Sequence, residues 1–455
     1  MGTKVEQVDA DEAEERLERA AAIDVAKASG MVCTRTPGPS RRRVTRVWDV
    51  SSTTKSILAL ADELAEDGIE RVVLESTSDY WRPFYYLLEA RGLTVWLVNS
   101  RDVKNVPGRP KTDKLDSVWL CKLNERGMLR PSFVPPQELR ELRDYTRLRH
   151  DLVAERSRHA QRLEKLLEDA LVKLSCVASD ILGRSGRDMI EALIAGERDP
   201  GTLAKLARGR MKAKHAQLVE ALTGRFDAHH AELARVLLDQ VDALTAKVDM
   251  LTARVAEIVA KLPSASVRSE GQPAAAQPGR SASPGPLRQC QEPLPVLDRL
   301  DEVPGIDRVA AQAIIAEIGL DMRQFPTSAH LVSWARISPR TVQSGPRTTS
   351  GTSGKANRYL RGVLGEVAAG AARTDTFLGE RYRRLVRRRG KQRALVAISR
   401  SILVIVWHLL ADPSARFADL GPDYYEKRID KDRKTRLLVR QLNALGHQVT
   451  LNPAA

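Results

Sequence analysis

Residues 137–262 carry the helical pattern that most constrains the fold of this 455-residue chain. The stretch contains one proline and is rich in Leu, Ala, Glu, Arg and Lys, which favour helices. Its last part has apolar residues spaced alternately four and three apart, which predicts a coiled-coil seam. These residues are Leu237, Val241, Leu244, Val248, Leu251, Val255, Ile258 and Leu262. We therefore expect a helical coiled-coil region over 137–262.

A less regular apolar arm over 148–170 is the partner that the seam needs. Two such arms can pack as an antiparallel hairpin within one chain, or they can pair between chains. The spacing does not decide between the two arrangements. We favour pairing between chains, which predicts a homo-oligomer, either a dimer or a tetramer.

The first hundred residues have a different pattern. From 21 to 100, short β-branched runs separated by turn residues alternate with helical periods, which is typical of an α/β domain. A closing helix over 112–126, with Pro110 before its start, completes a domain at 21–130. The strands are expected at 21–27, 30–36, 42–50, 70–77 and 93–100, and the helices near 55–67 and 80–91.

Composition marks the remaining boundaries. Residues 263–293 are rich in Pro, Ser, Gly and Ala and predict a flexible linker, because they lack the apolar content to offset ordering entropy. We expect a mainly helical domain over 294–412. Residues 1–20 are expected to form an acidic extension, and residues 413–455 a charged peripheral tail. Helices of this domain are expected at 294–302, 308–319, 328–335, 355–373 and 377–411, with a Ser/Thr/Gly/Arg loop at 338–357.

The charge balance indicates a polyanionic partner. Lys and Arg number 73 against 58 Asp and Glu, a net charge of +15. Aromatic residues are 4% of the chain, so phosphate contacts are favoured over stacking on single-stranded bases. Four dispersed cysteines support neither a zinc finger nor a disulfide framework, and the acidic N-terminus does not resemble a signal peptide. We expect a cytoplasmic protein, with the apolar stretch 394–410 as a buried helix and not a membrane span.

Four acidic residues of the first domain are candidates for a metal site. Asp24 lies inside an expected strand, Glu75 ends another, and Asp113 and Asp116 share one face of the closing helix. Converging carboxylates favour a hard cation, and two such cations can stabilise both the attacking and the leaving oxygen of a phosphodiester. The pattern predicts Mg²⁺; the alternative for each acid alone is an ordinary surface or capping residue. Nearby cations that could contact phosphate are Lys27, Arg109 and Lys111.

Ser344, in Gln343-Ser344-Gly345, is the candidate nucleophile of the last domain. A serine followed by glycine can present its hydroxyl on a turn, and guanidinium groups nearby suit a phosphate. Attack of this hydroxyl on DNA phosphorus would give a covalent phosphoserine. Spacing alone leaves a flexible loop as an alternative, with Ser338, Ser350 and Ser353 as rival nucleophiles. The flanking cations are Arg340, Arg347, Lys355 and Arg358.

Two other segments of the last domain are candidates for nucleic-acid binding. The run 381–393 has eight cations in thirteen positions, which favours nucleic acid over a merely solvated helix face. Its predicted contacts are Arg383, Arg384, Arg387 and Arg388. The turn 303–306 resembles a helix-hairpin-helix that binds duplex phosphate, and a purely structural hairpin, with Asp307 as a helix cap, is the alternative.

Together these motifs resemble the IS110 family of insertion-sequence transposases, over about 21–126 and 294–410. The first span resembles the family's RuvC-like, ribonuclease-H-type domain, whose DEDD acids match Asp24 in IDVAK, Glu75 in VLEST, and Asp113 and Asp116 in KTDKLD. The second resembles its C-terminal transposase domain, through VPGIDRVAAQAIIAEIG, QFPTSAHLVSWARISPR, QSG and SGKANRYLRGVL. On this match Ser344 is the catalytic serine.

The resemblance implies a recombinase that forms serine–DNA linkages with Mg²⁺ and exchanges strands between element ends and target. It implies double-stranded DNA as partner, assembly as a dimer of dimers, and in some members a structured bridge RNA as guide. Two alternatives remain open. One is a metal-dependent junction-resolving nuclease in which the acids activate water. The other is a non-catalytic DNA-binding protein.

Overall fold

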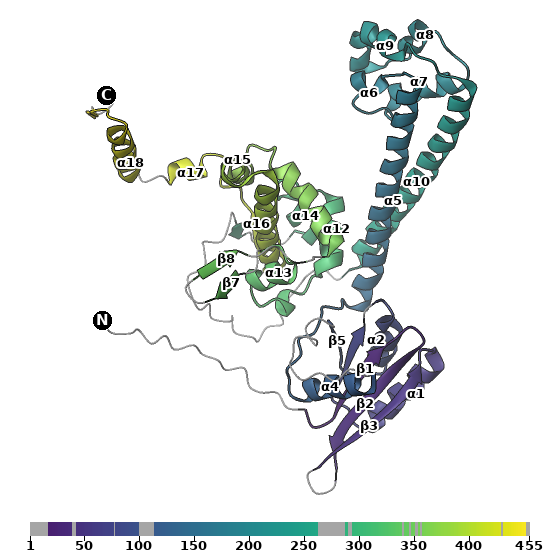
Figure 1. Cartoon of the computed structure of the whole chain (residues 1–455), viewed down its shortest axis with the longest axis vertical. Coiled ribbons are helices and arrows are strands. Elements are labelled where there is room, and N and C mark those ends of the chain that lie inside the picture. Colours follow the sequence, from purple (N-terminus) through teal and green to yellow (C-terminus); the bar gives the residue numbers. More distant parts are fainter. Residues whose placement is uncertain are drawn as a thin grey trace. The chain divides into compact units, whose positions relative to one another are not determined.

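The computed structural model divides into two compact units, residues 1–134 and 135–455, which are treated separately below (Figure 1). The residues it describes are 17–38, 42–76, 78–99, 113–262, 287–289, 294–338, 341–344, 347–350, 354, 357–428 and 431–451.

Unit 1 is an α/β domain built on a mixed five-stranded sheet, as predicted. The strand order is β3-β2-β1-β4-β5, with β1, β2 and β3 antiparallel and β4 and β5 parallel to β1. The strands are β1 (Ala20–Val25), β2 (Ser29–Pro37), β3 (Arg43–Ser51), β4 (Arg71–Ser76) and β5 (Val95–Val98). The helices are α1 (Thr54–Glu66), α2 (Trp81–Ala90) and α4 (Asp113–Glu125).

Alternation along the strands gives the sheet two buried faces. On one face Ile23 and Leu74 pack with apolar residues of α1 and α2, such as Ile57 and Phe84. On the other face lies a second core that includes residues of α4. Its strand and helix members include Ala20, Ala22, Cys33, Val73, Val98, Leu120, Cys121 and Leu123. The even-numbered residues of β1 therefore face α4.

Hydrogen bonds fix how α4 lies on that face. The Asn124 side chain donates to the carbonyl oxygens of Ala21 (3.0 Å) and Arg71 (3.1 Å). Ala21 is the second residue of β1 and Arg71 is the first residue of β4. The Cys121 thiol donates to the Ala20 carbonyl (3.3 Å). The carboxyl end of α4 thus lies at the amino ends of these strands. Its first turn extends from there toward their carboxyl ends.

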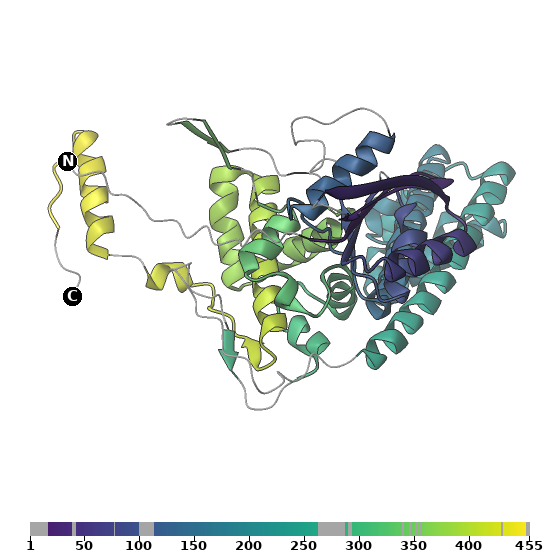
Figure 2. The ribbon, with the colours of Figure 1, turned by 90° about the horizontal axis from the view of Figure 1, so that it is seen from below.

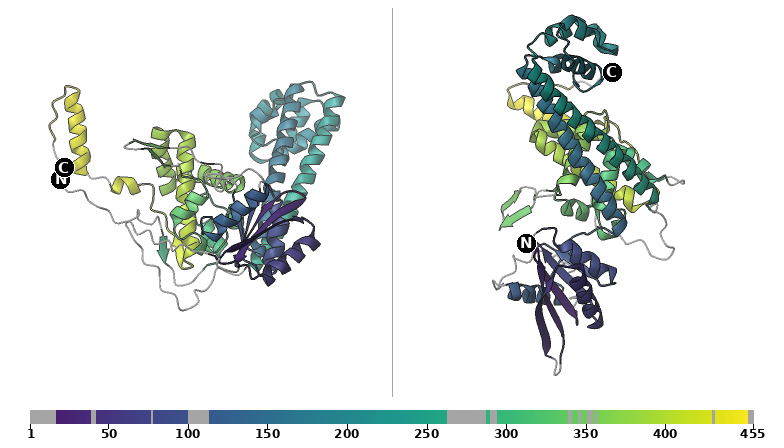
Figure 3. Two further views of the ribbon diagram at one scale, coloured as in Figure 1. Left: turned by 60° about the horizontal axis from the view of Figure 1, so that its bottom comes forward. Right: turned by 90° about the vertical axis from the view of Figure 1, so that its right-hand side faces the viewer.

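Unit 2 begins with a pair of long helices, α5 (Gln137–Asp169) and α10 (Ala228–Lys261). They run antiparallel, because Leu142 shares a core with Val255 at one end and Leu167 shares one with Leu238 at the other (Figure 3). The predicted arms thus pair within one chain in this structure, while oligomerisation and the description as a coiled coil stay predictions. The buried positions of α10 include Ala234, Leu238, Val241, Leu244, Val248, Leu251, Val255 and Ile258.

The start of the predicted seam is wrong by one residue. Leu238 is fully buried, whereas Leu237 is half-buried. The physical reason is that the first turns of α10 pack on a bundle of short helices at the end of the pair, here called the helical cap. Its members are α6 (Leu174–Val177), α7 (Arg184–Ile194), α8 (Pro200–Lys205), the 3₁₀ helix η2 (Gly209–Lys214) and α9 (His215–Leu222).

The other end of the helical pair joins the core formed by the helices that follow residue 294. Leu139 and Leu142 of α5, and Val255 and Ile258 of α10, share one core with them. Figure 2 shows these helices from below. They are α11 (Val296–Asp301), α12 (Arg308–Ile318), η3 (Met322–Gln324), α13 (Ser328–Trp334), α14 (Arg358–Ala371), α15 (Phe377–Arg389) and α16 (Lys391–Ala411).

Two details of this domain differ from the sequence-based expectation. The single helix expected at 377–411 is two, because Gly390 adopts φ +76° and separates α15 from α16. A short strand β6 (Leu287–Gln289), inside the expected linker, pairs with β9 (Ala415–Phe417) of the expected tail. Beyond β9 lie α17 (Tyr424–Lys427) and α18 (Lys431–Ala444).

Apolar side chains explain why part of the tail is not peripheral. Phe417 is buried in the core, and Tyr425 stacks on Phe377 with ring centroids 5.6 Å apart.

Among the described helices, α16 is long and apolar enough to cross a membrane. Ile398, Ile402, Val406 and Leu409 of this helix are fully buried in the domain core. Their burial agrees with the expected buried helix.

Candidate functional site

Two of the four predicted acids are direct neighbours in the sheet of unit 1. Asp24 of β1 and Glu75 of β4 are partners in the parallel register. They share a face with Ala22 and Val73, which is the face covered by α4. Glu75 is 6% exposed and Asp24 is half-buried. The sheet thus places two carboxylates side by side near the carboxyl ends of two strands.

The other two acids lie on α4. Asp113 is its first residue, and Asp116, one turn later, is half-buried. Ser117 and Leu120 are fully buried, so this part of the helix stays on the sheet. Asp116 therefore lies on the same face as Asp24 and Glu75, toward the ends of the strands that carry them. Of Asp113 the structure describes the backbone.

The donors of this set are all carboxylate oxygens, which suit a hard cation such as Mg²⁺. Within the described residues, however, the group of potential ligands whose atoms all lie within 4.8 Å of one another is a different one, Asp169, His229 and His230 in unit 2. The arrangement of Asp24, Glu75 and Asp116 fits a hard cation through the chemistry of its carboxylate donors and through their position on one face of the sheet.

The histidine group has a structural explanation. The backbone N–H of Asp227 donates to Nδ1 of His230 (3.1 Å), in a capping box at the start of α10. Nε2 then carries the proton of the neutral ring and donates to Asp169 (3.2 Å). Both ring nitrogens are occupied by this capping arrangement, so His230 is poorly suited to bind a metal.

Ser344 lies in a β-hairpin that Figure 2 shows projecting from the helices of unit 2. The hairpin consists of β7 (Thr341–Ser344) and β8 (Arg347–Ser350), and Ser344 pairs with Arg347 across it. The predicted loop 338–357 is therefore partly ordered as strands. Ser344 is the last residue of β7, next to the turn. Two of its predicted flanking cations, Arg340 and Lys355, lie outside the described residues, as do Arg109 and Lys111 of unit 1.

A polar network anchors the carboxyl end of the segment that carries the hairpin. Glu317 of α12 is 2% exposed and accepts two hydrogen bonds from Arg147 of α5 (2.7 and 2.9 Å) and one from the side chain of Asn357. Asn357 also caps α14 through Tyr359 N–H (3.0 Å). Burial works to lower the pKa of Arg147, but the hydrogen bonds and charge of Glu317 outweigh it and hold that pKa above its ordinary value. Sequence reasoning missed this network, although Asn before a helix is a recognisable capping signal.

Arg358, predicted to bind nucleic acid, belongs to the same region. Its guanidinium donates to Asp151 of α5 (3.0 and 3.1 Å) and lies 4.5 Å from the Tyr359 ring. The Tyr359 hydroxyl donates to the same carboxylate (2.9 Å). Arg358 is therefore engaged in holding α14 to α5, and a phosphate would have to compete with Asp151.

The predicted basic run falls on α15 and the start of α16. Arg383 is paired with Glu380 (2.9 Å) and Asp375 (3.1 Å), so its charge is largely balanced. Arg384 is exposed and lies 4.3 Å from the Tyr425 ring. Arg387 and Arg388 are exposed and form no ion pair with the described acids. Of the four contacts predicted in this run, Arg384, Arg387 and Arg388 are thus the available cations.

The turn at 303–306 is packed against the protein. Gly305 has φ +90°, and a Cβ there would lie 2.3 Å from the Val367 carbonyl oxygen of α14. Asp307 caps α12 by accepting from Ala310 N–H (2.7 Å). Both features fit the structural-hairpin alternative better than an open phosphate site.

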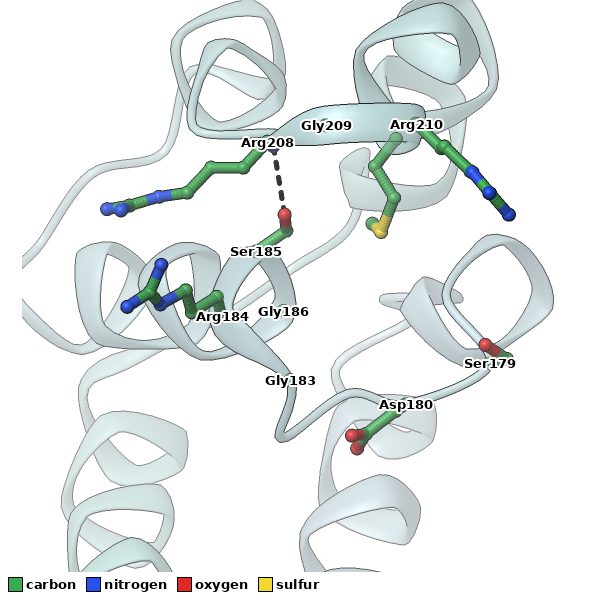
Figure 4. Close-up of a pocket in the computed structure, with 10 residues that line it drawn as sticks. Ser179, Asp180, Gly183, Arg184, Ser185, Gly186, Arg208, Gly209 and Arg210 are labelled. Carbon is green, nitrogen blue, oxygen red and sulfur yellow. Dashed lines mark hydrogen bonds between the residues drawn. The ribbon is translucent and has the colours of Figure 1, made fainter.

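The helical cap contains a cavity of about 390 Å³ between the start of α7 and η2 (Figure 4). The backbone N–H of Arg208 donates to Ser185 Oγ (2.9 Å) at its side. Arg184 and Arg210 line it, but so does Asp180, and Arg208 is paired with Asp188 (2.6 Å). This mixed charge makes it a weaker phosphate site than the surface of α15.

Comparison with known proteins gives two matches to family models. A model described as Transposase, with the DEDD and IS110 designations, matches residues 21–171. A model described as Transposase IS116/IS110/IS902 family matches residues 297–383. No curated protein matches the chain. The first match contains all four predicted acids, and the second contains Ser344 and ends at Arg383, the third residue of the basic run.

Proposed function

The chain belongs to the IS110 family of transposases, and from that premise we propose that it recombines DNA through a covalent phosphoserine at Ser344. The observation that carries the proposal is the register of β1 and β4, which sets Asp24 beside Glu75 on the face covered by α4. A hard cation at these acids can neutralise the charge that develops on a phosphate during phosphoryl transfer. The position of Ser344 at the end of β7 supports its role as nucleophile.

In the proposed reaction the Ser344 hydroxyl attacks a DNA phosphorus atom. A P–O bond forms to Ser344 Oγ, and the bond to one deoxyribose oxygen breaks. The serine proton is lost to solvent, and the departing oxygen takes up a proton, so that charge balances. In strand exchange a hydroxyl of another DNA end attacks the phosphoserine and regenerates the free serine. No external energy source is needed, because one phosphodiester replaces another.

Asp24, Glu75, Asp113 and Asp116 would hold Mg²⁺, with carboxylate oxygens as ligands. When bound, the cation would neutralise charge on the scissile phosphate and favour the serine alkoxide. The acids belong to unit 1 and the serine to unit 2. The reaction therefore requires both units to reach one phosphate, and we infer that activity depends on assembly on DNA.

Double-stranded DNA, at the element ends and the target, is the proposed partner. The exposed Arg384, Arg387 and Arg388 of α15 would contact its phosphates, in a salt-dependent manner. A structured guide RNA and assembly as a dimer or tetramer remain proposals that rest on family membership. A cytoplasmic location accords with a DNA-acting enzyme.

The decisive experiment is a search for covalent adducts with Ser344→Ala. A supercoiled plasmid carrying the gene with its flanking DNA is incubated with protein and Mg²⁺, and protein–DNA adducts are sought on denaturing gels. We expect adducts with the natural chain and none with Ser344→Ala, while DNA binding persists. Ser350→Ala, in the opposite strand of the same hairpin, is the matched control and should keep the adducts. Adducts that persist in Ser344→Ala would show that another residue is the nucleophile.

The same experiment separates the alternatives. A junction-resolving nuclease would give free DNA ends without any adduct, and Asp24→Asn would abolish them. A non-catalytic DNA-binding protein would give neither product, and Asp24→Asn would leave DNA binding unchanged.

A further inference from the structure

A second cavity of unit 2 lies where the segment carrying Ser344 leaves and rejoins the helical domain. It has a volume of about 130 Å³. Arg336 and Ile337, just after α13, form the side from which the segment departs, and Arg361 of α14 lies one turn after the point of return. The remaining lining residues belong to α14 and α16: Leu364, Gly365, Gln392, Leu395, Val396 and Ser399.

The lining combines an apolar wall with two cations. Ile337 and Leu364 are buried, and Leu395 and Val396 are half-buried. Ser399 Oγ donates to the Leu364 carbonyl (3.0 Å), which ties α16 to α14 beneath the cavity. Ligand sites in proteins typically pair such a wall with a few placed polar groups. Here the placed groups are the guanidinium groups of Arg336 and Arg361.

Backbone conformation gives independent evidence that the Arg336 side chain has a role. Arg336 adopts φ +54°, a left-handed conformation that favours glycine. It stands just after α13, where its N–H bonds to Ser333 O (3.0 Å) and Ile337 N–H bonds to Val332 O (3.3 Å). These are the two bonds of a Schellman motif, whose left-handed position is usually glycine. Helix termination alone would therefore favour glycine over arginine.

Arg336 and Arg361 also differ from other arginines of this domain in their ion pairs. Arg358 and Arg383 are paired with carboxylates. Among the described residues, no acid forms an ion pair with Arg336 or Arg361. Two cations at one cavity, one of them on left-handed backbone and neither with an acidic partner among the described residues, are an arrangement that an anion stabilises.

We propose that this cavity binds a phosphodiester group of the DNA strand that is presented to the hairpin of Ser344. Arg336 and Arg361 donate to the phosphate oxygens, and the wall of Ile337, Leu395 and Val396 contacts the adjoining deoxyribose. The choice of DNA as the strand rests on the proposed function. The role of the two residues is binding and positioning, since Ser344 remains the nucleophile.

The test uses the full chain with Ser344→Ala, so that binding is measured without chemistry. Its probes are a mixed-sequence DNA duplex and the corresponding single strand. We expect Arg361→Gln and Arg336→Gly each to weaken binding about tenfold, as for loss of one charged hydrogen-bonding group, and to reduce the slope of log K against log salt by about 1. Arg400→Gln, an exposed cation of α16 outside the cavity, is the matched control and should change binding less than about threefold.

Arg336→Gly supplies a readout that a structural role would not produce. Because glycine suits the left-handed position, its thermal midpoint should equal or exceed that of the parent by up to about 3 °C. Binding should nevertheless fall. A lower midpoint with unchanged DNA binding would show that Arg336 serves the fold, and would overturn the proposal.

Chemical modification provides a second measurement. Phenylglyoxal, which modifies guanidinium groups, is applied with and without the duplex, and modified peptides are quantified by mass spectrometry. Arg336 and Arg361 should be protected by DNA and Arg400 should not. Equal protection of all three, or equal losses of binding in all three variants, would indicate a general basic surface and no site.

The cavity proposal and the proposed serine chemistry can fail independently, and the experiments distinguish the two failures. Failure of the natural chain to form adducts would refute the serine chemistry and leave the binding result standing. Adducts that form normally in Arg336→Gly and Arg361→Gln, with unchanged binding, would refute the cavity and leave the chemistry standing.

Discussion

Asp24 and Glu75 are direct partners in the register of two parallel strands, and both face α4. Neighbouring positions in a parallel sheet project to the same side, so the carboxylates share one small region. Like charges held in this way favour a cation. This relationship also makes the metal dependence testable without any DNA substrate.

Mg²⁺ should stabilise unit 1 through these acids. We expect Mg²⁺ to raise the thermal midpoint of the natural chain, because a ligand at about 100 times its Kd adds about 2.7 kcal/mol of stability. Asp24→Asn should abolish the rise. Asp49→Asn, which removes an exposed acid of β3 in the same sheet, is the control and should retain it. An equal response to Mg²⁺ in Asp24→Asn would place the cation elsewhere.

Glu317 should be essential for the stability of the C-terminal domain. It is buried and accepts from Arg147 and Asn357. Glu317→Ala leaves the half-buried guanidinium group of Arg147 and the side-chain amide of Asn357 without their acceptor, so a loss of about 1–3 kcal/mol is expected in urea unfolding. Glu366→Ala, an exposed acid of α14, should cost less than about 0.5 kcal/mol. Similar losses in both variants would contradict a structural role of the network.

Low pH should destabilise the helical cap through Glu191. Desolvation works to raise the pKa of Glu191, but hydrogen bonds from Arg235 and Arg187 outweigh it and hold that pKa below its ordinary value. A carboxyl whose folded pKa is depressed contributes stability above its unfolded pKa of about 4.3, and that stability is lost as pH falls through the lower folded pKa.

Glu191→Gln should therefore lower the midpoint at neutral pH and lessen its fall between about pH 5 and about pH 3. Differential scanning calorimetry across this range provides the measurement. Asp321, whose pKa the Arg323 hydrogen bond also lowers, lies outside the cap, and Asp321→Asn is the control. An unaltered acid response of the cap transition in Glu191→Gln would contradict this assignment.

Local pattern was sufficient to predict much of the fold. The five strands of unit 1 were foreseen because β-branched runs such as 71–76 are bounded by turn residues. The helices of unit 2 follow from their apolar periods. The break at Gly390 and the strand β6 were not foreseen. Whether glycine continues or ends a helix depends on packing, and a three-residue strand depends on a partner over 120 positions away.

The sequence predicts which residue types form the candidate site, but it predicts little of how they are arranged in space. Pattern and resemblance predict Asp24, Glu75, Asp113 and Asp116 as site residues, but the register that sets the first two side by side is seen only in the sheet. The pairing of Arg358 with Asp151 joins residues 207 positions apart, which no local spacing reveals. Arg336 carries no sequence signal, because its significance lies in a left-handed backbone that only the structure shows.

The pairing of α5 with α10 within one chain leads to the last prediction. Leu238 is fully buried where α10 meets α5 and the helical cap, whereas the neighbouring Leu237 is half-buried. Leu238→Ala should therefore cost about 2–5 kcal/mol in urea unfolding, and Leu237→Ala less than about 1.5 kcal/mol.

Measuring the unfolding midpoint at several protein concentrations shows whether Leu238 stabilises a single chain or an interface between chains. Because the seam is buried inside one chain, the difference in midpoint between Leu238→Ala and the natural chain should not depend on concentration. A difference that changes with concentration would instead mean that the seam pairs between chains. The subunit interface would then include α10. If the difference does not depend on concentration, the seam is already filled within one chain, and any subunit interface must use other surfaces.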